Sequence, residues 1–185
     1  VTPLALQMGS GVKLASTQRI MSQGSLQATG VDTDIAINGE GFFRVQQYDG
    51  SYAYTRDGSF KIDSNGQLVN SNGLRVMPEI IMPENFESNT LTISDDGRVT
   101  VKVLGNDDPL DVGQLEIYRF ANPAGLTAEG DNLFTVSNAS GDAIASRPGL
   151  DGAGTTKQRY LEASNVSVVN EMVQMIVAQR AYEFN

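Results

Sequence analysis

Residues 34–77 read DIAINGEGFFRVQQYDGSYAYTRDGSFKIDSNGQLVNSNGLRVM and carry the strongest structural signal in this 185-residue chain. Ile35 and Ile37 start a period of two, which is typical of a β-strand. Turn-forming pairs then recur at intervals of eight, eight and seven residues, at Asp49-Gly50, Asp57-Gly58, Asn65-Gly66 and Asn72-Gly73. Each pair supplies residues that tolerate positive φ, as two-residue hairpin turns require. The pattern predicts a mainly β fold, built as an antiparallel meander.

Short segments rich in strand-forming residues lie between these turns, and similar segments follow downstream. Asn38-Gly39 is expected to turn the chain between strands at residues 35–37 and 42–45. In the strand expected at residues 115–120, Leu115 and Ile117 fall on one face, and Tyr118 and Phe120 on the other. Further strands are expected at residues 52–55, 59–62, 67–69, 74–77, 91–93, 99–103, 133–136 and 143–145. Between them we expect an edge strand or crossing connection at 78–83, loops at 106–109 and 122–132, and a glycine-rich bend at 148–154.

Residues 164–185, SNVSVVNEMVQMIVAQRAYEFN, contain no Gly or Pro and show the period of an α-helix. Apolar side chains follow two adjacent helical lines: Val166, Val169, Val173 and Ile176, and Val168, Met172, Met175 and Tyr182. This face is wider than one small β body needs, so we expect a partner, either the rest of the same protein or other copies of it. No helix stop signal is present, so we expect a helix cut out of a longer one. The alternative is an ordinary terminal helix that caps its own core.

The fold prediction is an antiparallel β-meander or sandwich-like body with an extended N-terminal arm and one C-terminal α-helix. The arm spans residues 1–33, because glycines interrupt this stretch and Ser, Thr and Gln fill it. The β-rich body spans residues 34–160, and residues 161–185 are the start of the C-terminal helix. A chain of this length is expected to bury about 70% of its unfolded surface.

The composition excludes several classes of function. The net charge is −9 with 13 Lys and Arg and no basic cluster, so nucleic acid and anionic membranes are not expected partners. No apolar run is long enough to span a membrane, so no membrane insertion is expected. The first residues lack the basic and apolar regions of a signal peptide. Cys and His are absent, which removes thiolate nucleophiles, disulfides and the usual zinc ligands.

Carboxylates are the remaining candidates for chemistry, and none forms a recognisable site. Asp95-Asp96 and Asp107-Asp108 lie in an expected turn and loop, without the spaced ligands of a calcium loop. We therefore expect no enzyme activity, no catalytic or metal-binding residue and no cofactor. Tyr48, Tyr52 and Tyr54 lie close together in the sequence. They form either cross-strand pairs and core, or the sugar-stacking platform of a secreted β-rich carbohydrate-binding module.

Several motifs, in order, resemble the bacterial flagellar axial proteins of the rod and hook. DIAINGEGFF at residues 34–43, YTRDGSF at 54–60 and NGQL at 65–68 resemble the core of this family. The segments 152–154, 160–166, 171–176 and 179–183 resemble its C-terminal signature. The resemblance assigns the family core motif to Asn38, Gly39, Gly41, Phe42, Phe43, Tyr54, Thr55, Arg56, Asp57 and Gly58. It assigns an assembly helix to Val169, Met172, Val173, Met175, Ile176, Gln179, Arg180 and Tyr182.

Within this family the chain is most similar to the distal rod type, and a proximal rod or hook-type protein is the alternative. The resemblance implies a structural subunit that polymerises into a helical tube and transmits torque from the motor to the hook. Its implied partners are copies of itself and neighbouring rod, hook and ring proteins. Its implied location is the periplasm-spanning rod of the basal body, reached by flagellar export without a cleaved signal peptide. Full-length members have N- and C-terminal helices that coil together, so the resemblance implies a core fragment.

Overall fold

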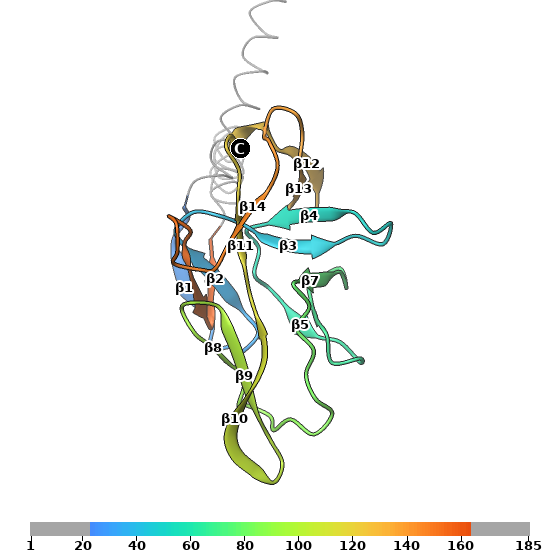
Figure 1. The fold of residues 1–185 in the computed structure, drawn as a ribbon, viewed down its shortest axis with the longest axis vertical. Helices are drawn as coiled ribbons and strands as arrows, with labels where there is room; N and C mark the ends of the chain where they lie inside the picture. Colours follow the sequence, from blue (N-terminus) through green and yellow to red (C-terminus); the bar gives the residue numbers. More distant parts are fainter. Residues whose placement is uncertain (1–22, 164–185) are drawn as a thin grey trace, which may run out of the picture. The chain divides into compact units, whose positions relative to one another are not determined.

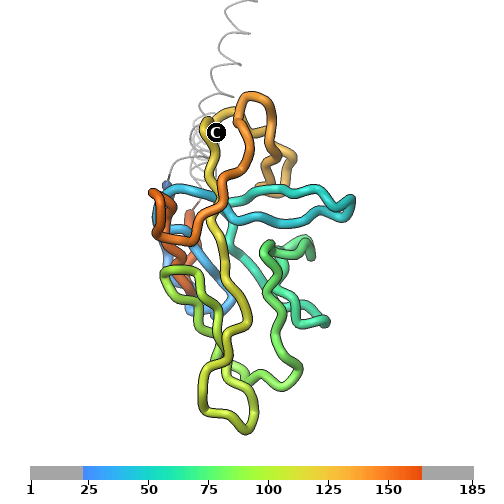
Figure 2. The backbone as a smooth tube through the Cα atoms, viewed as in Figure 1, coloured from blue at the N-terminus to red at the C-terminus, as the bar shows by residue number. Residues whose placement is uncertain are grey.

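The computed structural model describes residues 23–163 (Figures 1 and 2). The predicted helix at residues 164–185 and most of the predicted arm lie outside the described residues, so both stay predictions. Residues Leu26–Glu162 form one compact unit, and all the strands belong to it. The described residues contain no α-helix, and the mainly β class is confirmed.

The strands are short, as expected for a chain punctuated by turns. Their bounds are β1 Leu26–Ala28, β2 Ile35–Asn38, β3 Phe43–Gln46, β4 Tyr52–Thr55, β5 Lys61–Ile62, β6 Leu68–Val69, β7 Arg75–Met77 and β8 Thr92–Ile93. They continue with β9 Arg98–Val103, β10 Asn106–Gln114, β11 Ile117–Arg119, β12 Thr127–Gly130, β13 Leu133–Thr135, β14 Ile144–Ser146, β15 Thr155–Gln158 and β16 Tyr160–Glu162. A 3-10 turn, η1, spans Pro123–Gly125.

The strands pair throughout in the antiparallel sense. The largest sheet has seven strands in the order β12-β13-β4-β3-β7-β6-β5. The β9–β10 hairpin, which also pairs with β8, extends to the lower end of the unit in Figure 1. Three two-stranded sheets complete the fold: β15-β2, β11-β14 and β1-β16. Strands β5, β6 and β7 follow one another in the sheet as a meander does, whereas β3 lies between β4 and β7.

Two identical turns explain the seven-residue spacing of Asn65-Gly66 and Asn72-Gly73. The side-chain oxygen of Asp63 accepts the backbone N–H groups two and four residues further on, both at 2.9 Å. The side-chain oxygen of Asn70 does the same at 3.0 and 2.9 Å. Gly66 and Gly73 adopt φ of 81° and 82°, which few other residues tolerate. Each turn therefore has a local cause, and both predicted hairpins are confirmed.

Two other predicted hairpins are wrong, because the chain bends at each place but does not connect paired strands. Asn38-Gly39 follows β2, but β2 pairs with β15, with Ile35 opposite Gln158. Asp57-Gly58 follows β4, whose partners are β3 and β13. There the Gly58 carbonyl accepts the Ile35 N–H at 3.1 Å, and Ser59 forms an isolated antiparallel bridge with Asp34, so the chain runs beside the start of β2 instead of folding back on β4.

The two predicted loops are also wrong, at least in part. Residues 106–109 belong to β10, and the turn lies just before them, where Gly105 adopts a φ of 85°. Residues 122–132 contain η1 and β12. Strand β12 and the first six residues of β10 are exposed, so these stretches lack the alternation of apolar and polar residues that would have revealed them. Residues 78–83 form no strand, but Ile81 makes an isolated antiparallel bridge with Gln67, so the segment is a connection with one edge-type pairing and both alternatives hold in part.

The core has an aliphatic part and an aromatic part, and residues 115–120 contribute to both, as predicted. Leu115 and Ile117 are buried in the aliphatic part. Tyr118 and Phe120 face the aromatic part, where the ring of Phe120 lies 4.9 Å from that of Tyr54 and 5.7 Å from that of Phe42. The aliphatic part consists mainly of Ile35, Ile37, Val45, Leu68, Val76, Ile80, Val99, Val101, Leu115 and Ile117.

Candidate functional site

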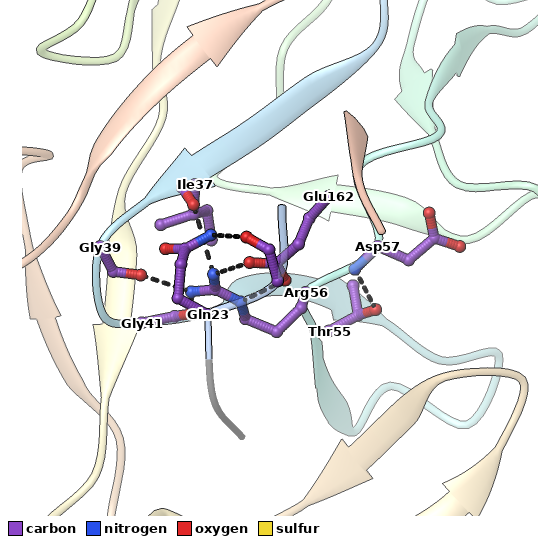
Figure 3. A network of polar contacts seen from close by, with 9 residues as sticks. Gln23, Ile37, Gly39, Gly41, Thr55, Arg56, Asp57 and Glu162 are labelled. Carbon is purple, nitrogen blue, oxygen red and sulfur yellow. Dashed lines mark hydrogen bonds and ion pairs between the residues drawn. The ribbon is translucent and has the colours of Figure 1, made fainter. Parts of the chain in front are cut away.

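The two halves of the predicted core motif meet in space. Residues 38–43 form the loop from β2 to β3, and residues 54–58 lead out of β4. Arg56, the first residue after β4, reaches back to this loop (Figure 3). Its Nη1 donates to the carbonyl oxygens of Gly39 at 2.7 Å and Gly41 at 2.8 Å, and its Nη2 donates to that of Ile37 at 3.2 Å.

The same guanidinium group binds the carboxylate of Glu162 in β16. Nη2 donates to Oε2 at 2.5 Å and Nε to Oε1 at 3.0 Å (Figure 3). The side chains of Arg56 and Glu162 are only 11% and 8% exposed. An arginine side chain carries five N–H donors, and all five have an acceptor here. The bidentate geometry is one that a lysine ammonium cannot reproduce.

Glycines in the loop are required by close approach as well as by conformation. Gly39 and Gly41 adopt φ of 126° and 124°. A Cβ at Gly39 would lie 2.7 Å from the Cα of Gly154, and a Cβ at Gly41 would lie 2.0 Å from Cγ2 of Ile117. The Gly152-Ala-Gly154 stretch, quoted with the C-terminal signature, therefore packs directly on the core motif.

The remaining motif residues shape the body around this loop. Phe42 joins the aromatic part of the core, and Phe43 packs its ring edge-on against Phe60 at 5.0 Å. Thr55 accepts the Asp57 N–H at 3.0 Å, which turns the chain after β4. Asn38 is the one exposed residue among the ten, and the structure assigns no side-chain hydrogen bond to it. The motif therefore lies mostly inside the body.

The three tyrosines of the carbohydrate hypothesis do not form an open platform. Tyr54 is buried, and its hydroxyl accepts from Arg44 at 2.9 and 3.1 Å. The Arg44 guanidinium covers the ring of Tyr52 at 4.3 Å and that of Tyr118 at 4.0 Å. Tyr48 lies apart at the β3–β4 turn, where its hydroxyl donates to a backbone carbonyl at 3.1 Å. The cross-strand and core interpretation of Tyr52 and Tyr54 fits this geometry.

Reasoning from the sequence included Arg56 but missed Glu162 as its partner. Glu162 stands in the quoted YLEASN stretch, but a single sequence does not show which distant charges meet. The eight predicted assembly-helix residues lie outside the described residues. Within residues 23–163 no cluster of three potential metal ligands occurs, and no helix is long and apolar enough to cross a membrane.

Two family models match the regions of the chain that contain Arg56 and Glu162. The family model described as "Flagellar hook protein FlgE/F/G D1 domain" matches residues 36–101, which contain the core motif. The model described as "Flagellar basal body rod FlgEFG protein C-terminal" matches residues 157–185, which contain Glu162. Arg56 and Glu162 thus link two separately recognised regions.

Individual relatives match along almost the whole chain. The flagellar basal-body rod protein FlgG of Borreliella burgdorferi is 55% identical over 99% of this chain and 69% of its own length. FlgG of Buchnera aphidicola is 49% identical over 99% of this chain and 70% of its own length. FlgG of Caulobacter vibrioides is 43% identical over 100% of this chain and 70% of its own length. The chain belongs to the FlgG family of flagellar basal-body rod proteins and is a structural subunit of the distal rod type, from a family that is not one of enzymes.

Proposed function

We propose that this chain polymerises with copies of itself into a helical tube, and that the tube transmits torque from the motor to the hook. The observation that carries the proposal is the 55% identity to a FlgG rod protein over 99% of the chain. A rod needs contacts between unlike surfaces, because heterologous contacts that do not close generate helical filaments. Neighbouring rod, hook and ring proteins are then its other partners.

We further propose that this rod spans the periplasm and that the chain is exported through the flagellar secretion apparatus without a cleaved signal peptide. The family's basal-body location supports both statements. Nucleic acid is not among the proposed partners, because the net charge of −9 repels another polyanion.

In this proposal each part of the chain has its own structural role. Residues 34–160 form a sandwich-like body that supplies the wall of the tube, and residues 1–33 form an extended arm. Residues 161–185 begin the assembly helix, whose contacts come from the eight residues that the family resemblance assigns to it. The C-terminal family match at 157–185 covers all eight and supports this role. The core motif acts inside the body, in keeping with the burial of Gly41, Phe42, Phe43, Tyr54, Thr55 and Gly58.

The test places charges on the proposed helix face. Met172→Asp with Ile176→Asp should abolish rod assembly and motility, because each carboxylate would have to enter a packed layer. Gln174→Asp is the matched control, because at 100° per residue position 174 lies on the opposite side of such a helix. Basal bodies isolated from cells carrying each variant show whether a rod is present. Motile cells with both face substitutions would refute the proposal.

A further inference from the structure

The pairing of β1 with β16 forms a ribbon that is separate from the other sheets. The two strands have three residues each, and within residues 23–163 no backbone ladder joins them to a third strand. A two-stranded ribbon of this length is at best marginally stable by itself. Leu26 pairs with Glu162, so the start of β1 lies beside the end of β16. The chain therefore enters and leaves the compact unit at one end of this ribbon.

At its other end the ribbon is joined to the body through Arg159. This residue adopts a φ of 69°, which is uncommon for a residue with a side chain. Its N–H donates to the Asp34 carbonyl at 2.7 Å, and its own carbonyl accepts the Thr29 N–H at 2.8 Å. Its Nε also donates to Asp32 at 3.0 Å. These contacts turn the chain from β15, whose partner is β2, into β16, whose partner is β1.

The end of the ribbon where the chain leaves is held differently, by the side chains of Glu162 and Arg56. Glu162 is the last residue of β16, and its carboxylate is anchored to the β2–β3 loop through the guanidinium group of Arg56. The contact joins residues 106 positions apart. Because both side chains are almost excluded from water, losing either leaves a poorly solvated charge in place of a contact.

We propose that Arg56 and Glu162 act as a clamp that holds the β1–β16 ribbon against the body, and that this clamp positions both strand ends for assembly with a second copy of this chain. The proposal rests on the proposed function and adds two positioning residues to it. Arg56 lies in the D1 family match at 36–101, and Glu162 lies in the C-terminal match at 157–185. The clamp is thus a charged side-chain link between the region that forms the body and the region that leads into the proposed assembly helix, beside the neutral hydrogen bonds of Gln158 to Leu91 and Ile93.

The experiment compares this ion pair with an exposed one of the same chemistry. Arg56→Lys keeps the positive charge but removes the planar guanidinium group that makes the bidentate contact. Glu162→Gln keeps the shape of the side chain but removes its negative charge. Arg98→Lys and Asp111→Asn are the controls, because Arg98 and Asp111 pair on the surface with both side chains 50% exposed. Hydrogen exchange is measured on the whole chain for the amides of β1 and β16, and for those of β3 and β4.

Each clamp variant should speed exchange in β1 and β16 by about tenfold and leave β3 and β4 within about twofold of the unsubstituted chain. The controls should change neither. Unchanged exchange in β1 and β16 would overturn the clamp. Equal acceleration of all four strands would overturn it as well, because the pair would then only support the whole fold.

Rod assembly in cells is the second measurement, because it distinguishes a positioning role from a purely structural one. Cells carrying Arg56→Lys should lose rods and motility although β3 and β4 keep their protection, whereas the Arg98→Lys cells should swim normally. Normal rods with Arg56→Lys would overturn the positioning role. If the unsubstituted chain itself builds no rod, the proposed function fails, but the exchange data still decide whether the clamp exists.

Discussion

The carbonyl oxygen of Ile35 occupies the space that a side chain at Gly58 would need. A Cβ built on Gly58 would lie 1.5 Å from this oxygen, and the Gly58 carbonyl also accepts the Ile35 N–H at 3.1 Å. The two backbones run antiparallel here in direct contact, next to the isolated bridge between Asp34 and Ser59. The glycine is therefore required because the Ile35 backbone lies so close. The Asp57-Gly58 pair in the sequence would instead suggest that the glycine is there for its turn conformation.

Gly58→Ala should cost more than about 3 kcal/mol of unfolding free energy, because the backbones must separate and the Ile35 hydrogen bond is lost. Gly50→Ala is the matched control. Gly50 adopts a φ of 89°, but its Cβ would meet no atom within 4 Å. That change should cost only about 1–2 kcal/mol of conformational strain. Urea unfolding of both variants measures the difference, and similar midpoints would contradict the close backbone contact between Ile35 and Gly58.

Arg44→Lys tests the stacking of Arg44 between two aromatic rings. The guanidinium lies 4.3 Å from the ring centre of Tyr52 and 4.0 Å from that of Tyr118, and it donates to the Tyr54 hydroxyl. A lysine keeps the charge but not the flat stack or the paired donors, so we expect a loss of about 1–2 kcal/mol. Thermal or urea unfolding measures it. The surface change Arg98→Lys should cost less than about 1 kcal/mol, and an equal loss would argue against the stack.

Alkaline pH should weaken the fold through Tyr118. Burial raises the pKa of its hydroxyl, so the folded state keeps a proton that the unfolded state releases above about pH 10. Below that pH both states hold the proton and stability does not change. Above it the unfolded state binds fewer protons, so stability falls by up to about 1.4 kcal/mol per pH unit for this group.

Tyr118→Phe removes this proton and should make the alkaline loss smaller. Urea unfolding at pH 8 and pH 11 gives the loss of unfolding free energy for the unsubstituted chain and for Tyr118→Phe. The other tyrosines and the lysines contribute about equally to the loss in the two proteins. Tyr118→Phe also removes a hydrogen bond from the hydroxyl to Glu116 at 3.1 Å, which lowers stability at both pH values and cancels in the difference. Equal alkaline losses would show that Tyr118 does not carry the effect.

The elements that the sequence predicts well are those with a local cause. At Asn65-Gly66 and Asn72-Gly73 the turn is made by a side-chain oxygen two or three residues away and by a glycine with positive φ. Strand β4 at Tyr52–Thr55 coincides with its predicted range, because the Asp49-Gly50 turn precedes it and the Thr55 hydroxyl, which accepts the Asp57 N–H, turns the chain after it. Such features need no information about distant parts of the chain.

The elements that it predicts poorly depend on distant partners. Strand β2 pairs with β15 across more than a hundred residues, so the Asn38-Gly39 pair was wrongly expected to fold it onto β3. Strand β10 contains Asp107, Asp108 and Pro109 and is ordered mainly by pairing with β9. The same limit applies to the clamp. Arg56 stands in a recognisable motif, but the carboxylate that pairs with it belongs to Glu162, which lies 106 positions later in the sequence.

Strand β10 forms the outer edge of the β9–β10 hairpin. Among the described residues β10 pairs only with β9, so one side of this nine-residue strand has no β partner. Its pairing is interrupted between Asn106 and Leu110, where two aspartates and Pro109 lie. Charges, proline and irregular pairing are the usual protections of a strand edge against association with another chain.

Asp108→Val with Pro109→Val should therefore make the protein aggregate without unfolding it. The two changes supply a β-branched strand with its full set of edge N–H groups and less charge, so edge-to-edge pairing becomes favourable. Asn138→Val with Asp142→Val is the matched control, because both positions are exposed and lie outside the strands. Light scattering during incubation at increasing concentration measures association, and circular dichroism checks that the fold is kept. If solutions of the two double variants scatter light equally weakly, Asp108 and Pro109 do not protect this edge.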